Sequence, residues 1–322
     1  MLNLNNKLPT ITTITPSLNR AKFIDEAIKS VLNQDYPHVE HIIIDGGSTD
    51  GTLDVLALYP NLKVISEPDQ GIYDAINKGI RMAKGDIIGI LNSDDYYEPN
   101  FFSELAEIFH SNQDIDAIVG GIDILKMDAS GSWKPILVFP TINYQNFWYR
   151  ITIGSPNTNG WFIRKRFFDQ IGMYNLNYPS VSDRDFILRM AFSSVNYFPF
   201  DKLIYHYRIH SNSITLDGSF DGEAEFIFEL RNLVEDYINS SKIHFSTKKY
   251  LFDWHSDIIS SQTIAAIRKN KIRRATFYAM YGCRINPKWP YHFLRRILLA
   301  IIRRIIVVFN PLIKGSYLVC DH

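Results

Sequence analysis

Residues 87–95, which read IIGILNSDD, join an apolar run to a cluster of acidic side chains. The run Ile87–Leu91 is almost entirely apolar, which is typical of a strand buried on both faces of a sheet. Asp94 and Asp95 follow shortly after it. Adjacent carboxylates repel each other unless a cation, hydrogen bonds or water surround them. Taken alone, the pair is explained most simply as a solvated turn. It also fits a site for a hard cation such as Mg²⁺ or Mn²⁺.

The residues before this strand alternate between two apolar patterns. β-branched runs predict strands, and apolar residues at helical spacing predict helices. The expected strands are 11–15, 39–44 and 62–65, and the expected helices are 23–32, 52–59 and 72–83. This order predicts an α/β fold with a mainly parallel sheet and helices on both faces. Ligands of such sheets bind beyond the carboxyl ends of the strands. Polar residues follow all four strands, namely Thr15-Pro16-Ser17, Asp45, Glu67-Pro68-Asp69 and Asn92-Ser93-Asp94-Asp95.

The later part of the chain changes from mixed structure to helices. Further strands are expected at 117–125, 136–139 and 197–209, and a helix is expected around 186–192. After about Ser219, only helical patterns remain, at 220–237, 250–267 and 271–281. We therefore expect a nucleotide-binding domain in residues 1–215, a helical extension in 216–286 and a basic amphipathic segment in 287–322.

The charges of the chain are divided unevenly although its net charge is zero. Residues 268–322 contain 12 Lys and Arg but a single acidic residue, Asp321, so the rest of the chain holds 22 basic and 33 acidic residues. Such a tail should seek anions. Nucleic acid is one candidate partner. The sequence contains no recognised nucleic-acid-binding module, so we expect no nucleic acid to bind. The other candidate is an anionic membrane.

Residues 293–309 are apolar apart from four arginines, at 295, 296, 303 and 304. A helix advances ~100° per residue, which gathers these arginines on one side and Leu, Ile and Val on the other. This is the pattern of a helix lying in a membrane interface. A spanning helix is disfavoured because arginines near the bilayer centre are costly. A C-terminal helix packed on the rest of the protein is the alternative.

Three motifs in this order resemble those of the family 2 glycosyltransferases: PSLNR at 16–20, IDGGSTDGT at 44–52 and NSDD at 92–95. The stretch DQGIYDAINKG at 69–79, followed by Gly85-Asp86, resembles a bacterial branch of that family. The resemblance covers roughly residues 10–213. It implies the GT-A fold and transfer with inversion from a nucleotide-diphosphate donor, in most members a UDP-sugar. The acceptor expected from it is a glycan or a polyprenyl-linked sugar in bacterial surface polysaccharide synthesis.

The resemblance also implies roles for single residues. Asp45 should contact the nucleotide base, Asp94 the ribose and diphosphate, and Asp95 a divalent metal. The other donor-site residues expected are Thr15, Pro16, Ser17, Arg20, Asp69 and Lys78. Many relatives carry an Arg of the donor site at the position of Ile76. Lys78 is the residue that could supply this positive charge instead. Asp94, and His210 in a Tyr-Arg-x-His motif, are further candidate metal ligands.

Residues 182–189, SDRDFILR, resemble the segment of the family that supplies the general base. Asp183 falls at the position of the base, with Asp185 as the alternative. Ser182 stands where the family usually has Glu. A carboxylate is needed here because an acceptor hydroxyl is a poor nucleophile until its proton is removed.

Two other function classes fit parts of the sequence. A sugar-phosphate nucleotidyltransferase would also use an α/β fold and Mg²⁺, but it should carry a Gly-rich, basic loop after the first strand, and residues 15–20 do not form one. A non-catalytic nucleotide-sugar-binding membrane protein is the second. The two cysteines and the polar start of the chain predict no disulfide framework and no signal peptide. We therefore expect a cytoplasmic protein on the inner face of the plasma membrane.

Overall fold

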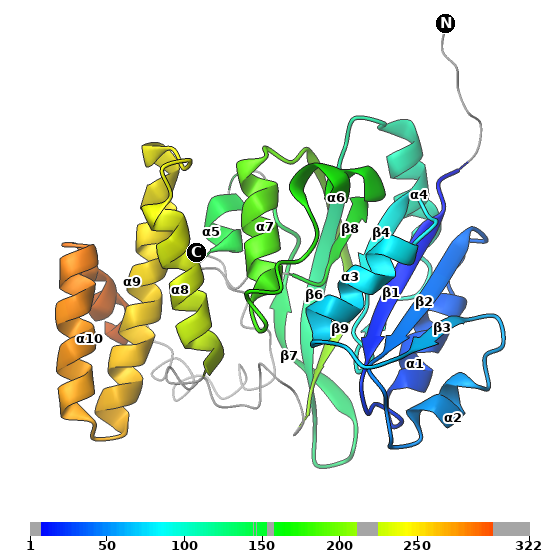
Figure 1. Cartoon of the computed structure of the whole chain (residues 1–322), viewed down its shortest axis with the longest axis horizontal. Helices are drawn as coiled ribbons and strands as arrows, with labels where there is room; N and C mark the ends of the chain where they lie inside the picture. Colours follow the sequence, from blue (N-terminus) through cyan, green and yellow to red (C-terminus); the bar gives the residue numbers. More distant parts are fainter. Residues whose placement is uncertain (1–7, 144, 146, 153–157, 211–224, 299–322) are drawn as a thin grey trace, which may run out of the picture. The chain divides into compact units, whose positions relative to one another are not determined.

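The computed structural model describes residues 8–143, 145, 147–152, 158–210 and 225–298 (Figure 1). These residues fall into two compact units. The first unit takes its residues from Met1–Leu125, Leu137–Gln145 and Asn157–Arg208, and the second from Lys126–Ile136, Asn146–Pro156 and Ile209–His322.

Half of the main sheet is parallel. The parallel half consists of β3 (Lys63–Ser66), β2 (Val39–Asp45), β1 (Ile11–Ser17) and β4 (Ile87–Ile90), in that spatial order. Every pairing among these four strands is parallel. The strands are short and rich in isoleucine, which suits burial between two layers of helices. The α/β fold expected from residues 11–91 is confirmed.

Helices cover both faces of this parallel half (Figure 1). Ile14 lies opposite Ile42 in the β1–β2 register, so both point to one face. There α3 (Ile72–Met82) packs so closely that Gly79 leaves no room for a Cβ against Ile14. Ile43 points to the other face, where it clusters with residues of α1 (Ile24–Leu32) and α2 (Thr52–Leu56). The acidic strand ends are thus held by a sheet that is packed from both sides.

The other half of the sheet is antiparallel. β8 (Trp161–Arg164) runs antiparallel to β4 and to β6 (Ala117–Met127), and β9 (Tyr197–Ile209) runs antiparallel to β5 (Tyr96–Tyr97). β7 (Trp133–Phe139) pairs with β6. The pairing of β5 with β9 matters for the site, because it brings the end of β9 next to the residues that follow Asp94 and Asp95.

Three helices of the first unit pack beside the antiparallel strands: α4 (Phe102–Ser111), α6 (Lys165–Ile171) and α7 (Ser182–Phe192). An aromatic cluster holds α4 in place, since the rings of Tyr97, Phe101, Phe102 and Phe162 contact one another edge-on or tilted. The start of α7 places Asp183 and Asp185 in its first turn.

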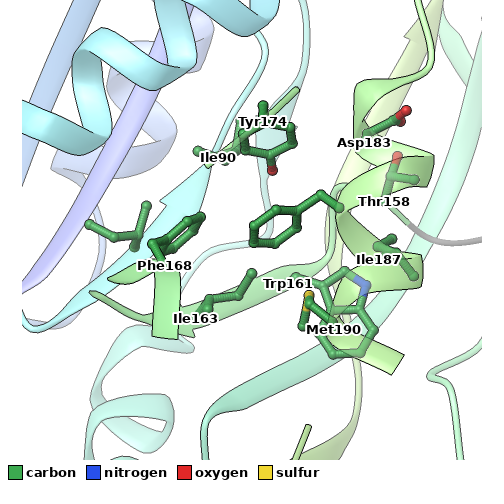
Figure 2. A pocket seen from close by; sticks show the side chains of 11 residues that line it. Ile90, Thr158, Trp161, Ile163, Phe168, Tyr174, Asp183, Ile187 and Met190 are labelled. Carbon is green, nitrogen blue, oxygen red and sulfur yellow. The ribbon is translucent and has the colours of Figure 1, made fainter. Parts of the chain in front are cut away.

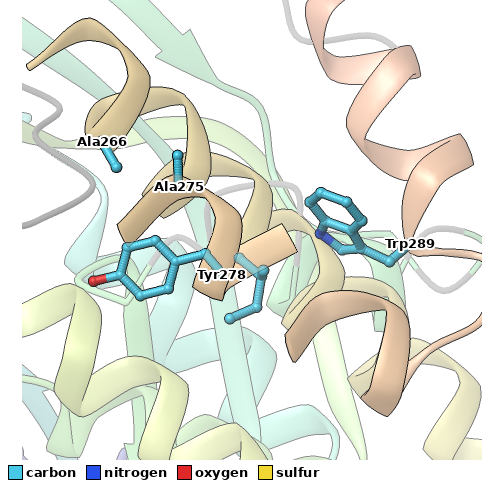
Figure 3. Close-up of a cluster of buried hydrophobic side chains, with 5 residues drawn as sticks. Ala266, Ala275, Tyr278 and Trp289 are labelled. Carbon is cyan, nitrogen blue, oxygen red and sulfur yellow. The ribbon is translucent and has the colours of Figure 1, made fainter. Parts of the chain in front are cut away.

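The second unit is mainly helical in its described part. It contains α5 (Phe147–Ile151), α8 (Glu225–Asn239), α9 (Phe245–Arg268) and α10 (Ile272–Ile285). α9 begins earlier than the predicted Tyr250, and part of the predicted helix 220–237 lies outside the described residues. Ile259, Ala266, Ala275, Tyr278 and Trp289 form the core between these helices (Figure 3). Among the described helices, none is both long enough and apolar enough to span a bilayer.

Candidate donor and catalytic site

The ends of the parallel strands meet at one edge of the sheet. Ser17 lies opposite Asp45, and Asp45 lies opposite Ser66, so β1, β2 and β3 end side by side. Backbone hydrogen bonds continue this alignment into the loops. The N–H of Gly46 donates to the carbonyl of Ser17 at 2.8 Å, and the N–H of Glu67 donates to that of Asp45 at 3.0 Å. The predicted convergence of the loops is therefore present.

The motif at residues 44–52 fastens the loop that follows β1. Ser48 Oγ accepts a hydrogen bond from the N–H of Asn19 at 2.7 Å, and the N–H of Thr49 donates to Asn19 Oδ1 at 2.9 Å. Asp50 Oδ2 accepts from the N–H of Ala21 at 3.1 Å. Short polar side chains at these spacings are needed because they replace the backbone partners that an irregular loop lacks.

Asp45 is fully buried and its carboxylate is used within this loop. It accepts hydrogen bonds from the N–H groups of Gly47 at 3.1 Å and Ser48 at 2.9 Å. The hydroxyls of Ser48 and Ser66 donate to it at 2.5 and 2.8 Å. This arrangement explains the residue as the anchor of the loop. The contact with a nucleotide base that the resemblance implies remains a prediction.

Asp69 lies over the backbone of the same loop. Its Oδ2 is only 2.6 Å from the point where a Cβ on Gly46 would lie, and its Oδ1 accepts a hydrogen bond from the N–H of Gly71 at 2.9 Å. Asp69 keeps part of its surface exposed at the edge of the sheet. It is therefore better placed than Asp45 to meet a ligand directly.

Asp94 faces Arg20 across the ends of β1 and β4. Arg20 Nε lies 3.2 Å from Asp94 Oδ2, and the two side chains are 19% and 18% exposed. The guanidinium also donates to the carbonyls of Leu18 and Asn19, each at 3.0 Å. The structure thus brings together two of the residues predicted for the donor site, and both remain reachable from solvent.

Asp95 is fully buried and is held by the end of β9. It accepts hydrogen bonds from the Tyr205 hydroxyl at 2.6 Å, the Arg208 N–H at 2.8 Å and Asn92 Nδ2 at 3.1 Å. Burial raises the pKa of the Asp95 carboxyl, and the charge of Asp94 raises it further, although the three hydrogen bonds lower it. The Arg208 side chain also contacts Glu26 and the carbonyl of Asp94.

Sequence reasoning missed these supports of the acidic pair. Tyr205 lies 110 residues from Asp95 along the chain. The Tyr-Arg-x-His motif was the available signal, because it placed Arg208 in a segment of interest. His210, the residue of that motif predicted as a metal ligand, directly follows β9 and belongs to the second unit. Its part in a metal site remains a prediction.

The acidic pair suits a divalent cation with few protein ligands. Among the described residues, no group of three or more His, Cys, Asp or Glu side chains is gathered for a metal. Mg²⁺ in nucleotide sites often takes only one or two carboxylates and completes its shell with phosphate oxygens and water. Asp94 presents a carboxylate that is 18% exposed, and the buried Asp95 carboxylate follows it directly in the chain. The residues present therefore fit such an ion.

Three other predicted donor residues lie in β1. The Thr15 hydroxyl is buried against His41 Nε2 at 2.9 Å, and burial lowers the pKa of His41 to about 3, so the imidazole is neutral. Pro16 is buried beside it. The Ser17 hydroxyl is buried and makes no hydrogen bond within the described part of the chain. Of these three side chains, Ser17 alone has an unused polar atom at the strand end.

Lys78 is occupied by neighbouring acidic residues. Its Nζ lies 2.9 Å from Glu67 and 3.5 Å from Asp74, and it donates to the carbonyl of Pro68 at 3.0 Å. These contacts tie the loop after β3 to α3. A donor-binding role for Lys78 requires that it leave at least one of these partners, and it remains a prediction.

The motif at residues 69–79 holds the segment that leads to α7. The Asn77 side chain, which is buried, donates to the carbonyl of Tyr174 at 2.8 Å and accepts from its N–H at 3.0 Å. The ring of Tyr73 stacks on that of Tyr174, with centroids 5.5 Å apart. Desolvation raises the pKa of the Tyr73 hydroxyl, and the nearby Asp183 carboxylate raises it further.

Asp183 and Asp185 have different surroundings. Asp183 is half-buried and lines a small pocket together with Thr158 and Tyr174, with Phe168 on the opposite side (Figure 2). The pocket volume is about 10 Å³, which is room for one water and not for a sugar. Asp185 is buried and pairs with Arg189 Nε at 2.8 Å. Asp183 is therefore the more accessible of the two side chains, and its role as the base remains a prediction.

Arg189 explains why Asp185 is needed where it is. Besides Asp185, the guanidinium donates to three successive carbonyls, those of Ile171, Gly172 and Met173, at 2.5, 3.1 and 2.7 Å. Asp185 neutralises and orients this clamp on the end of α6.

Comparisons with known proteins show the family of the chain. The family model described as "Glycosyl transferase family 2" matches residues 12–172. A "PGL/p-HBAD biosynthesis glycosyltransferase" of Mycobacterium bovis is 29% identical over 187 residues, which are 56% of this chain and 69% of that protein.

Solved structures share the fold. The S. aureus TarS segment 1–349 in complex with UDP-GlcNAc has a TM-score of 0.56 at 18% identity, over 78% of this chain and 72% of that one. A longer TarS chain has a TM-score of 0.54 at 18% identity, over 78% of this chain but only 43% of its own length. The mannosyltransferase PcManGT of Pyrobaculum calidifontis, with GDP-Man and Mn²⁺, has a TM-score of 0.54 at 17% identity, over 91% and 86% of the two chains.

Proposed function

Because the chain belongs to glycosyl transferase family 2, we propose that it transfers a sugar from a nucleotide-diphosphate donor to an acceptor hydroxyl with inversion at the anomeric carbon. The observation that carries this proposal is the meeting of the β1 and β4 loops at Arg20 and Asp94. A UDP-sugar is the proposed donor. It is supported by the resemblance of the motifs and by the UDP-GlcNAc named for the TarS segment.

The donor diphosphate is proposed to lie against Asp94 and Arg20. A divalent ion, Mg²⁺ or Mn²⁺, would stabilise the negative charge that develops on the departing diphosphate. Asp94 would hold this ion, with Asp95 directly behind it; the Mn²⁺ named for the mannosyltransferase structure supports such an ion. Tyr205 and the Arg208 N–H orient Asp95, so that its position is fixed before the donor arrives.

Asp183 is proposed to take the proton of the acceptor hydroxyl. Asp183 is partly exposed in the first turn of α7 and accepts a hydrogen bond from the N–H of Arg184 at 2.8 Å, whereas Asp185 is buried and pairs with Arg189. Attack from the side opposite the leaving diphosphate breaks the bond to the donor as the new glycosidic bond forms, which inverts the configuration. The proton leaves with Asp183, and the nucleoside diphosphate leaves with both electrons of the broken bond.

The proposed acceptor is a glycan or a polyprenyl-linked sugar used in bacterial surface polysaccharide synthesis. This acceptor is the one that the resemblance of the motifs implies, and the relative named for PGL/p-HBAD biosynthesis is likewise a biosynthetic glycosyltransferase. Residues 293–309 would hold the protein on the cytoplasmic face of an anionic membrane, where a lipid-linked acceptor is confined to two dimensions. Most of that segment lies outside the described residues.

A product assay tests the proposal. The protein is incubated with a panel of UDP-, GDP- and dTDP-sugars and Mn²⁺, with bacterial lipid extracts as acceptor. We expect release of a free nucleoside diphosphate together with a sugar-modified lipid or glycan. Release of pyrophosphate would instead identify a sugar-phosphate nucleotidyltransferase. A donor that raises the melting temperature but is never turned over would identify a nucleotide-sugar-binding protein without catalysis.

A further inference from the structure

We propose that α10 and the helical residues 289–298 form a membrane-binding surface for anionic lipid. We call it the α10 surface. It has two parts, which are Arg273, Phe277, Met280 and Arg284 on α10 and Tyr291, Leu294, Arg295 and Leu298 after it. It adds α10 to the membrane attachment proposed above for residues 293–309. Only its use, to bring the enzyme to a lipid-linked acceptor, rests on the proposed function.

One side of α10 packs and the opposite side is apolar but exposed. Ala275, Tyr278 and Gly282 are buried, and they face α9 and Trp289. Phe277 and Met280 on the far side are 60% and 69% exposed. An ordinary surface helix carries charged or polar residues on the side opposite its packed stripe. The exposed side of α10 therefore has the composition of a second contact surface.

Arginines flank this exposed apolar pair. With ~100° between successive residues of a helix, Arg273 and Arg284 point in nearly the same direction as Phe277 and Met280. Both arginines are exposed. A helix with apolar side chains between basic ones suits the boundary between acyl chains and phosphate headgroups, since apolar groups enter the former and cations contact the latter.

The residues after α10 repeat the pattern. Trp289 is buried and packs against Gly282, and Arg296 pairs with Asp257 of α9. Tyr291, Leu294 and Leu298 are 66%, 65% and 56% exposed. A C-terminal helix packed on the protein would bury its leucines and expose its arginines. Residues 289–298 pack on the protein through Trp289 and Phe293 on one side, while Leu294 and Leu298 on the other side stay exposed, so packing alone does not account for the apolar side of this helix.

The charge of the surface identifies its occupant. Residues 268–298 contain nine Lys and Arg and no Asp or Glu. A neutral apolar partner would make no use of the exposed Arg273 and Arg284 beside the apolar pair, and a soluble anion would leave Phe277 and Met280 in water. An anionic bilayer satisfies both, and each cation near such a surface raises partitioning about fivefold. The acidic remainder of the chain would be repelled by the same bilayer, which favours this surface as the point of contact.

The test measures sedimentation of the full chain with vesicles, independently of any sugar transfer. Vesicles of phosphatidylcholine with a quarter phosphatidylglycerol are compared with phosphatidylcholine alone. We expect Phe277→Ser/Met280→Ser to reduce partitioning to the anionic vesicles by about tenfold or more, and Arg273→Gln/Arg284→Gln by about 25-fold. Leu58→Ser is the matched control, because Leu58 is a 72% exposed leucine in the first unit. It should bind as the unaltered chain does.

Two results would overturn the surface. One is that the α10 variants, shown to be folded by circular dichroism, bind vesicles as well as the Leu58→Ser control does. The other is that the chain without vesicles sediments as a dimer that Phe277→Ser/Met280→Ser separates, which would make this face a contact between two copies. Turnover of nucleotide-sugar is followed in parallel on a soluble acceptor. Absence of turnover by the unaltered chain, with its vesicle binding intact and lowered by the α10 substitutions, would contradict the proposed function and leave the surface standing.

Discussion

Replacing Tyr205 by Phe should destabilise the protein by an amount that increases with pH. The change removes one hydroxyl, which donates at 2.6 Å to the buried Asp95 carboxylate, and leaves the ring in place. A hydrogen bond to a charged group is worth roughly 1.5–3 kcal/mol, and one to a neutral group about 1 kcal/mol. The cost should therefore be about 1 kcal/mol while Asp95 is protonated and about 2–3 kcal/mol once it is ionised.

The sign follows from the pKa of Asp95. Burial raises that pKa in the folded protein above its value in the unfolded chain, so ionisation of Asp95 weakens folding as pH rises. Loss of the Tyr205 hydroxyl raises the pKa further, because this hydrogen bond favours the charged form. The difference between the two proteins must then widen as pH passes through the titration of Asp95.

Urea unfolding followed by circular dichroism at pH 5 and pH 9, without metal, measures this difference. Tyr97→Phe is the matched control, since its hydroxyl is also buried but donates to a neutral carbonyl, that of Ile90, at 3.1 Å. Its cost should be the same at both pH values. The reasoning would be refuted if Tyr205→Phe lowered the free energy of unfolding by the same amount at both pH values, or by less than about 0.5 kcal/mol. Either result would mean that the hydroxyl does not donate to a charged group.

Three further predictions concern the site. Asp183→Asn should reduce transfer by about 100-fold or more, with unchanged donor affinity in calorimetry. Asp185→Asn should instead lower the free energy of unfolding by about 3 kcal/mol, because Arg189 loses its charged partner. The opposite pattern would exchange the roles of the two aspartates. Asp94→Asn should weaken Mn²⁺-dependent UDP binding by about tenfold or more. It should change the free energy of unfolding without ligand by only about 1 kcal/mol, because the partly exposed pair with Arg20 is weak. Binding of UDP that does not respond to EDTA in the unaltered chain would contradict a metal at this residue. Burial alone would lower the pKa of His206, but its hydrogen bonds to Asp123 and Glu98 outweigh burial and raise it. The stability it contributes is therefore complete below the pKa of an unfolded histidine and lost as pH rises through the folded value, so His206→Gln should cost more at pH 5.5 than at pH 9.

The parallel half of the sheet was predictable because each of its strands has a local apolar pattern. The strand β8 was not predicted, since Trp161–Arg164 is short and buried throughout, and so lacks an alternation to read. β5 has two residues and exists only through its pairing with β9. Such strands are defined by partners far away in the sequence.

The candidate site divides in the same way. The motifs marked Asp94, Asp95 and Asp183 as candidates, and the structure places the first two after β4 and the third in the first turn of α7. The sequence did not reveal that the Asp45 carboxylate is used by its own loop, or that Asp185 belongs to Arg189. Those facts depend on hydrogen bonds, which a motif does not specify.

Among related sequences, positions 46 and 69 should not vary independently. Asp69 Oδ2 lies 2.6 Å from the place that a Cβ of residue 46 would take, so any side chain at position 46 must displace that carboxylate. A lineage that gains a side chain at 46 would have to turn the Asp69 carboxylate away from its hydrogen bond to the Gly71 N–H, shorten residue 69 or move its loop. Glycine at position 46 and aspartate at position 69 are therefore expected to occur together. A pair of reciprocal substitutions should be tolerated where the first one alone is selected against.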